Sequence, residues 1–268
     1  MTTFAERVTL GRSGLSVGPL GVSGGYGVGS QALLRAFERG VNYWYHGSRR
    51  AAGMRDAIRE LVRSGRRDEL VVVMQSYSRW PGLLEGMLAR GLKQAGLEHA
   101  DVLLLGWYNH GVSPAILERC ERLREKGMFR QLGVSGHHRP SFVGYAAEPR
   151  FSVLHLRYNA ANSGAERDVF PALPREQRPG VVAYTATRWR KLLDAGSMPP
   201  GEAPLSAALC YRFVLSNPDV QVCMSGPADD AQMDEALSAL AAGPLTAEED
   251  RRVRRIGQHV HEHGSWWR

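Results

Sequence analysis

A Gly-Ser turn in the amino-terminal part of the chain is followed by two adjacent arginines, Arg49 and Arg50. Guanidinium groups bind carboxylates and phosphates through two parallel N–H groups, so this pair could clamp an anion. Tyr45 lies just upstream and could act as an acid or a base if an arginine beside it lowered its pKa by stabilising the phenolate. Both features also have structural explanations, because exposed arginines are common and Tyr45 can form an aromatic layer with Tyr43 and Trp44.

Three histidines, His259, His261 and His263, lie close to the carboxyl end of the sequence. On a helix, His259 and His263 would share one face, as pairs of zinc ligands do. Zinc sites need three or four converging ligands, and the sequence places no acidic or cysteine residue as the third. We therefore expect no metal site there.

Short runs rich in Val, Leu and Tyr recur along the chain, each bounded by turn residues. They predict eight strands at 22–23, 42–46, 70–75, 102–106, 131–135, 153–158, 181–185 and 220–224. Helical patterns alternate with them at 32–39, 54–64, 83–95, 114–126, 141–147, 166–173, 205–216 and 231–240.

This alternation predicts an α/β fold, a (β/α)8 TIM barrel, because every parallel strand needs a long crossover before the next one. The alternative is an open doubly wound sheet, which would carry a glycine-rich phosphate loop after its first strand. The glycines at 24, 25, 27 and 29 do not have the GxGxxG spacing of that loop. We expect one domain spanning residues 1–268.

Two stretches fall outside the repeat. Residues 8–10 and 15–17 flank a Gly-containing turn and predict an N-terminal β-hairpin that plugs the bottom of the barrel. Thr246 and Glu249 have the spacing of a capping box, which predicts a C-terminal helix running to about His261.

The composition is that of an ordinary globular chain, with 268 residues, 43% of them hydrophobic and 23% charged. The net charge of +7 is spread over predicted helices with acidic residues nearby, so we expect no nucleic-acid partner. No apolar run has the length of a membrane span and the first ten residues do not resemble a signal peptide, so we expect a cytoplasmic protein without a membrane partner.

Five motifs together resemble the aldo-keto reductase superfamily across essentially the whole chain. They are LGRSGL at 10–15, RAFERGVNY at 35–43, Gly96-Leu97 with DVLLL at 101–105, REKG at 124–127 and GVS at 133–135. The resemblance implies a (β/α)8 barrel whose carboxyl-terminal face binds NADPH and a carbonyl substrate.

The same resemblance implies a catalytic tetrad of Asp, Tyr, Lys and His, and this chain departs from it at all four positions. Alignment of the motifs puts Tyr45 at the Asp position, Arg50 at the Tyr, Gln75 at the Lys and Gly106 at the His. A glutamine cannot lower the pKa of a phenol as an ammonium does, so ordinary carbonyl reduction should be crippled.

The predicted strand ends nevertheless carry polar, aromatic and cationic residues, in a barrel mouth where catalytic residues usually lie. They either form a small-molecule pocket or are ordinary surface residues. We take Tyr45, Arg50, Gln75 and Trp107 as candidate catalytic residues. The whole set is Tyr45, His46, Arg49, Arg50, Gln75, Tyr77, Trp107, Asn109, His110, His137, Arg157, Asn159 and Tyr184.

The resemblance also implies a nicotinamide-cofactor site that this chain retains in part. Ser135 and His155 lie where the family holds the nicotinamide amide, and Tyr184 lies where an aromatic ring stacks on it. Gly226, Gln232 and Glu235 match the phosphate loop and the adenine-binding helix. Asp229 and Asp230 replace the cations expected at a 2′-phosphate, and their negative charge disfavours NADP. We therefore expect the chain to bind either NAD or no nicotinamide cofactor.

Three functions stay open on this sequence. The first is a small-molecule enzyme with altered or non-redox chemistry on a polar or anionic metabolite. The second is an NAD(P)-dependent oxidoreductase that uses substitute residues, and the third is a non-catalytic barrel that senses a nucleotide. Neither the substrate nor the oligomeric state follows from the sequence.

Overall fold

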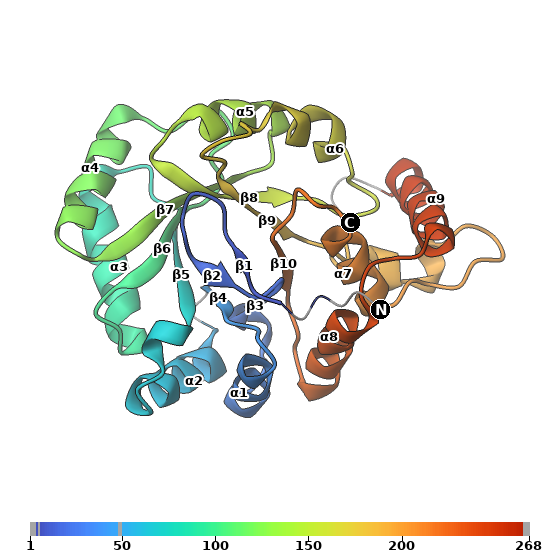
Figure 1. Ribbon diagram of the computed structural model, residues 1–268, viewed down its shortest axis with the longest axis horizontal. Coiled ribbons are helices and arrows are strands. Elements are labelled where there is room, and N and C mark those ends of the chain that lie inside the picture. Colours follow the sequence, from blue (N-terminus) through green and yellow to red (C-terminus); the bar gives the residue numbers. More distant parts are fainter. Residues whose placement is uncertain (1–3, 5, 48–49, 265–268) are drawn as a thin grey trace.

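The computed structural model describes residue 4 and residues 6–47 and 50–264, and it confirms the predicted (β/α)8 barrel. Eight parallel strands close in the order β10-β3-β4-β5-β6-β7-β8-β9 (Figure 1). They are β3 (Leu20–Ser23), β4 (Tyr43–His46), β5 (Val71–Ser76), β6 (Ala100–Leu105), β7 (Phe129–Gly136), β8 (Phe151–Arg157), β9 (Gly180–Tyr184) and β10 (Val222–Ser225).

Helices cover the outside of the barrel between consecutive strands (Figure 1). Their bounds are α1 (Ser30–Glu38), α2 (Ala52–Arg63), α3 (Pro81–Ala95), α4 (Pro114–Glu125), α5 (Arg139–Ala147), α6 (Ala165–Asp168), α7 (Ala207–Leu215) and α8 (Asp230–Ala242). All eight predicted strands are therefore present, and seven of the eight predicted helices agree with the structure to within a few residues.

The predicted helix over 166–173 is wrong in its extent. The structure has the single turn α6 and then a separate 3₁₀ turn at Phe170–Ala172. Pro171 lacks a backbone N–H and blocks a continuous α-helix, and Val169 before the 3₁₀ turn has left the helical conformation at φ −126°.

The predicted hairpin is present as β1 (Val8–Thr9) and β2 (Ser16–Val17), an antiparallel pair. Figure 1 shows it lying across one end of the barrel. Leu10 and Val17 are fully buried there and pack against the interior side chains of the strands. The opposite end, where the strands finish, is therefore the mouth.

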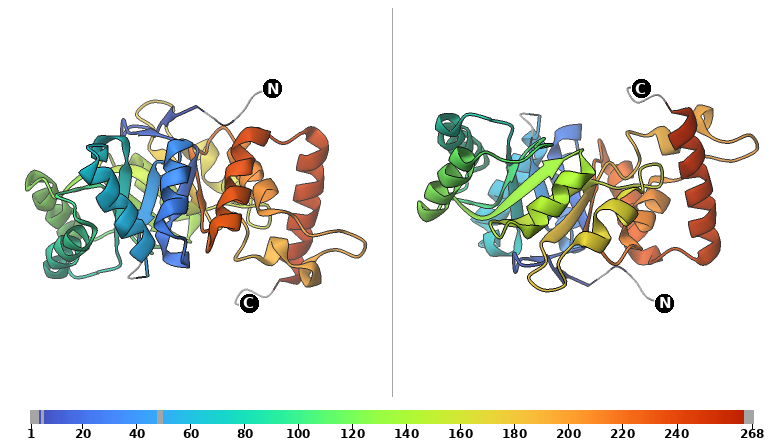
Figure 2. Two further views of the ribbon diagram at one scale, coloured as in Figure 1. Left: turned by 90° about the horizontal axis from the view of Figure 1, so that it is seen from below. Right: turned by 90° about the horizontal axis from the view of Figure 1, so that it is seen from above.

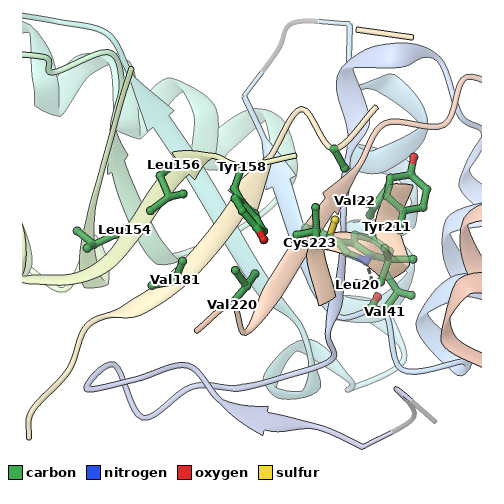
Figure 3. Close-up of a cluster of buried hydrophobic side chains, with 14 of the residues drawn as sticks. Leu20, Val22, Val41, Leu154, Leu156, Tyr158, Val181, Tyr211, Val220 and Cys223 are labelled. Carbon is green, nitrogen blue, oxygen red and sulfur yellow. Dashed lines mark hydrogen bonds between the residues drawn. The ribbon is translucent and has the colours of Figure 1, made fainter. Parts of the chain in front are cut away.

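The larger core lies between the strands and the helices, and Figure 3 shows part of it. Leu20 and Val22 of β3, with Leu154 and Leu156 of β8, point outward from the barrel toward this layer. Because side chains alternate along a strand, the residues between these positions face the barrel interior.

The predicted C-terminal helix is α9 (Ala247–His263), which runs along the outside of the molecule beside α7 and α8 (Figure 2). The Thr246 side chain accepts from the Glu249 N–H and the Glu249 carboxylate accepts from the Thr246 N–H, so the predicted capping box is confirmed. Within the described ranges, the helices are all too short or too polar to cross a bilayer.

Candidate functional site

Tyr45, Gln75 and Gly106 lie on or just after the neighbouring strands β4, β5 and β6, on the interior face of the barrel. Tyr45 and Tyr184 pack on the interior cluster that contains Val73 and Leu104. Gln75 lies two residues beyond Val73, and Gly106 two residues beyond Leu104, so both share that face. The structure thus brings together three of the four positions that the motifs align with the family tetrad.

Gly106 has no room for a side chain. A Cβ atom there would collide with Nε2 of Gln75 and would lie 2.7 Å from two ring carbons of Tyr77. Gln75 Oε1 is buried and has no hydrogen-bond partner among the described residues. The volume that a histidine would occupy is filled by Gln75 and Tyr77.

The hypothesis that an arginine lowers the pKa of Tyr45 is wrong. Burial raises the pKa of this phenol, and a hydrogen bond with Tyr77 and the nearby phenols of Tyr26 and Tyr184 raise it further. The Tyr45 ring also lies close enough to Gly47 that a Cβ there would collide with it. Tyr45 is therefore a neutral phenol that resists ionisation.

Arg50 lies outside this group. It is exposed, in the loop between β4 and α2, just before the helix begins. Arg49, its predicted partner in an anion clamp, lies outside the described residues. His46 is also displaced from the mouth, since it is buried on the outer face of β4, one residue out of phase with Tyr45.

An arc of aromatic rings runs around the mouth from β5 to β9. The ring centroids of Tyr77 and Trp107 are 5.6 Å apart, those of Trp107 and His137 6.1 Å, and those of His137 and Tyr184 5.8 Å. The Tyr184 hydroxyl donates to the Gly136 carbonyl at 2.6 Å. We call Tyr77, Trp107, His137 and Tyr184 the aromatic arc; it offers flat, partly apolar surfaces to a ligand.

Trp107 is held in an unusual backbone conformation at the centre of this arc. Its φ of 59° lies in the left-handed region, which costs a non-glycine residue about 1 kcal/mol or more. The Trp107 N–H donates to Ser135 Oγ at 3.3 Å, and its carbonyl accepts from Arg79 at 2.6 Å. These contacts hold the backbone of Trp107. Its indole is 61% exposed, and a cavity of about 400 Å³ lies beside it.

Ser135, which is aligned with the nicotinamide-amide site, and the neighbouring Gly136 are both closed off by contacts within the protein. Ser135 is buried, and its hydroxyl accepts from Trp107. The following residue, Gly136, is so close to Tyr108 that a Cβ would lie 2.5 Å from the Tyr108 carbonyl. A side chain larger than that of glycine therefore does not fit at position 136 in this arrangement.

His155 is buried inside the barrel rather than open to the mouth. Its Nε2 lies 2.7 Å from the Tyr43 hydroxyl, and its ring lies 6.5 Å from that of Tyr45. Burial lowers the pKa of His155 to about 3, so the imidazole is neutral at physiological pH. His155 belongs to the packed interior layer beneath the mouth.

Gly226 follows β10 and is covered by Tyr26, which the sequence reasoning missed. A Cβ on Gly226 would lie 2.7 Å from the Tyr26 ring. Tyr26 lies in the 3₁₀ turn Gly24–Tyr26 after β3 and is 60% exposed. It extends the aromatic surface of the mouth on the side opposite Trp107.

The residues aligned with the adenine and 2′-phosphate sites all have partners within the protein. Glu235 accepts from the Ala207 N–H at 2.8 Å, at the start of α7. Gln232 accepts from the Ala228 N–H at 3.1 Å and donates to Asp229, which caps α8. Asp230 forms an ion pair with Arg35, which offsets part of its repulsion of a phosphate.

These contacts decide whether a nicotinamide dinucleotide fits the residues that are aligned with its site. Ser135 and His155 are closed off at the nicotinamide end. At the adenine end, Gln232 and Glu235 are engaged in hydrogen bonds with backbone N–H groups of the protein. Tyr26 lies over the phosphate-loop glycine. In this arrangement the side chains do not match the cofactor site that the resemblance implies.

His259 and His263 lie on one face of α9, as their i, i+4 spacing predicts. The rings of His259 and His263 stack with their centroids 4.1 Å apart, and His263 Nδ1 lies 2.9 Å from the His259 carbonyl. Over the part of the chain that the structure describes, no three His, Cys, Asp or Glu side chains converge as metal ligands.

The segment after β9 contains further residues that the sequence reasoning missed. Arg188, Trp189 and Arg190 are three consecutive residues with positive φ, at 49°, 50° and 69°, and Thr185 has φ of 59°. Arg188 is only 8% exposed, whereas Trp189 is 57% exposed. None of these residues is glycine, so no sequence signal marked the left-handed turn.

Comparison with known proteins finds similar solved structures but no match of the sequence to a family model or a curated protein. An aldo-keto reductase from Bacillus halodurans has a TM-score of 0.74 at 19% identity in its apo form and 0.75 at 18% identity in its holo form. An aldo/keto reductase from Klebsiella pneumoniae, in complex with NADP and acetate, has a TM-score of 0.75 at 19% identity.

In all three comparisons the match covers 94% of this chain and 96% of the other chain. The agreement therefore includes the barrel, its helices and its order of strands. The chain has the (β/α)8 barrel fold of the aldo-keto reductases.

Proposed function

We propose that this chain is an aldo-keto-reductase-like enzyme that acts on a planar, polar or anionic small molecule by chemistry other than ordinary carbonyl reduction. The observation that carries this proposal is the packing at Gly106, where Gln75 and Tyr77 fill the volume aligned with the family's histidine. Elimination, cyclisation and isomerisation are the classes of reaction that fit.

The proton needed for carbonyl reduction has no source at the aligned positions. Reduction requires a phenol acidified by a neighbouring ammonium and imidazole, which together contribute roughly 10²–10⁴ in rate. Tyr45 has its pKa raised instead, Gln75 carries no charge, and Gly106 has no side chain. His155 lies near Tyr45 but is buried and neutral.

The mouth favours a flat ligand with negative charge. The aromatic arc and Tyr26 supply ring faces from β3, β5, β6, β7 and β9, and Arg157 lies at the end of β8. Rings and arginines together bind planar anions, because a ring face packs on a flat ligand while a guanidinium pairs with its charge.

A nicotinamide dinucleotide is the second candidate ligand, supported by the NADP in the Klebsiella pneumoniae structure. Its nicotinamide would supply hydride to a carbonyl, and the chain would be a reductase with substitute residues. The contacts of Ser135, His155, Gln232 and Glu235 oppose this assignment, and Asp229 with Asp230 disfavours NADP more than NAD.

The test measures consumption of NADPH and NADH with a panel of aldehydes and ketones, beside a binding titration with each nucleotide. We expect turnover well below 1 s⁻¹, the lower edge of ordinary enzymes, and no change in the Tyr45→Phe variant. Turnover of 1 s⁻¹ or faster that is lost in Tyr45→Phe would show that Tyr45 donates the proton. Tight nucleotide binding without turnover would favour the nucleotide-sensing barrel.

A further inference from the structure

We propose that the segment after β9 and the last turns of α9 form a second binding site, for a phosphate group or another doubly charged oxyanion. A cavity of about 290 Å³ lies between these two elements. Lys191 and Ser197 line it from the segment after β9, and His259 and His263 line it from α9. No residue of the aromatic arc takes part in this lining, so the inference does not depend on the proposed function.

Lys191 supplies a cation that the protein leaves available to a ligand. It is half-buried at the start of the 3₁₀ turn Lys191–Leu193, and its ammonium forms no hydrogen bond or ion pair with the residues that the structure describes. Asp194 accepts instead from Ser197 Oγ at 2.8 Å and from the Gly196 N–H at 3.3 Å. These bonds, together with the charge of Lys191, lower the pKa of Asp194. The three N–H donors of Lys191 can therefore serve an anion in the cavity.

His263 is oriented so that its protonation decides whether it can bind an anion. Its Nδ1 lies 2.9 Å from the His259 carbonyl, and because a carbonyl can only accept, Nδ1 carries a hydrogen. In the neutral ring Nε2 is then an acceptor, whereas in the protonated ring it is a second donor. The His259 ring stacks on that of His263 with centroids 4.1 Å apart, so two protonated rings would repel each other. An anion in the cavity that both rings line would offset this repulsion.

Arg188 adds a further positive charge behind the cavity wall. It is only 8% exposed, its Nη1 donates to the Val260 carbonyl at 3.0 Å, and a Cβ on Gly264 would lie 2.9 Å from its Nη2. Val260 and Gly264 both line the cavity, so the guanidinium lies directly behind them. Its bond to Val260 also occupies a carbonyl in the last turns of α9, where the negative end of the helix dipole would otherwise oppose an anion.

The backbone that presents these cations is strained and firmly held. Arg188 begins the run of three left-handed residues, and such a run persists only when its surroundings determine it. The carbonyl of Thr185 accepts from the Arg188 N–H at 2.8 Å and from Asn159 at 2.8 Å. Asn159, predicted to line the mouth, is instead fully buried and supports this turn. The Lys191 N–H donates to the Arg188 carbonyl at 3.1 Å, so the same turn positions both cations.

Two further charged side chains of α9 near the cavity have partners of their own. Arg255, one turn before His259, pairs with Glu202, and Glu262 accepts from Gln258 at 2.9 Å. Positive charge therefore predominates around the cavity once the histidines are protonated. Donors that come from two separate elements suit an oxyanion, whose oxygens accept from several directions.

The experiment titrates the full chain with sodium sulfate and follows the backbone amide cross-peaks of Gly196 and Gly264, which line the cavity, by NMR. The ionic strength is held constant with chloride. Sulfate stays doubly charged at about pH 5.5 and at about pH 8, on either side of the ordinary histidine pKa of about 6.5. We expect saturable binding that is about ten- to a hundredfold tighter at about pH 5.5, the usual effect of a hydrogen bond to a charged group.

Two sets of variants separate the contributions of the lysine and the histidines. Lys191→Met should weaken sulfate binding about ten- to a hundredfold at both pH values. The double variant His259→Gln with His263→Gln should remove the tightening at low pH, because glutamine cannot be protonated. His261→Gln is the matched control, since His261 is exposed in the same part of α9 and does not line the cavity. It should leave both dissociation constants unchanged.

Inorganic phosphate and phenyl phosphate, compared at about pH 7, distinguish a free anion from a phosphate monoester. Tighter binding of phenyl phosphate assigns a monoester and tighter binding of inorganic phosphate a free anion, and both results support the site. Sulfate binding that does not saturate, or that is unchanged in Lys191→Met, overturns the site. The site is also overturned if the double histidine variant keeps the full pH dependence. If Lys191→Met fails to fold, as judged by circular dichroism, the histidine variants carry the test.

Discussion

Gly106→Ala should lower the free energy of unfolding by about 1–3 kcal/mol, although it adds only one methyl group. The added Cβ would collide with Gln75 Nε2 and approach the Tyr77 ring to 2.7 Å, and real Cβ atoms essentially never come so close. Relief requires Gln75 and Tyr77 to shift together, and the Tyr77 hydroxyl is tied to Tyr45. The penalty therefore comes from overpacking and not from backbone strain.

A double-mutant cycle with Gln75→Ala isolates this contact. Removing the Gln75 amide opens the volume into which the new methyl group points, so Gly106→Ala should cost about 1 kcal/mol less in the Gln75→Ala background. The assay is urea unfolding followed by far-UV circular dichroism. Equal m values in the four proteins would show that the same surface is exposed in each.

Gly86→Ala is the matched control, because Gly86 lies inside α3 with nothing within 4 Å of a Cβ. It should leave the protein as stable or stabilise it by up to about 1 kcal/mol, since alanine favours a helix over glycine. A neutral Gly106→Ala, or a penalty that is the same with and without Gln75, would refute the packing argument.

Three further predictions concern α9 and the mouth. Arg212→Met should cost about 2–3 kcal/mol in urea unfolding, because Arg212 is buried and donates to the Glu249 carboxylate and to the carbonyls of Gly243 and Pro244. Hydrogen bonds with Arg212 lower the pKa of Glu249 from 4.5 to about 2. The ionised Glu249 carboxylate therefore stabilises the fold fully above pH 4.5, and this stabilisation is lost as the pH falls toward 2. Glu249→Gln should remove this part of the pH dependence of the free energy of unfolding. Arg50→Ala should weaken binding of a planar anionic probe such as 2-naphthoate by about 1.5–3 kcal/mol, the usual effect of a hydrogen bond to a charged group, and an unchanged dissociation constant in a calorimetric titration would exclude a role of Arg50 in orienting the anion.

The barrel could be predicted from the sequence because each strand is a short apolar run between turn residues. Val71 to Met74 and Val102 to Leu105 are buried on both faces and read as continuous apolar stretches, as parallel strands do. The same register placed Tyr45, Gln75 and Gly106 side by side. The one helix that failed did so at Pro171, whose effect on α6 depends on how the turn packs.

The chemistry of the mouth could not be predicted in the same way, because it depends on contacts between distant residues. The rise in the pKa of Tyr45 comes first from its burial and then from Tyr77, Tyr26 and Tyr184, which lie on three other segments. Arg188 donates to the carbonyl of Val260, 72 residues away, and Glu235 accepts from the N–H of Ala207, 28 residues away. Pattern and spacing identify which side chains face a barrel mouth, but not which of them bond to each other.

The closure of the barrel has a consequence for synthesis of the chain. Ser225 Oγ donates to the Gly21 carbonyl at 2.9 Å across a separation of 204 residues, and Arg12 of the hairpin donates to Phe151 and Gln177. At translation rates of about 5–20 residues per second, β3 emerges about 10–40 s before the strand that completes its pairing. During that time Leu10 and Val17 cannot reach their buried positions and β3 is an open edge that can pair with other chains. Aggregation of nascent chains is therefore a greater hazard for this protein than aggregation of the finished barrel.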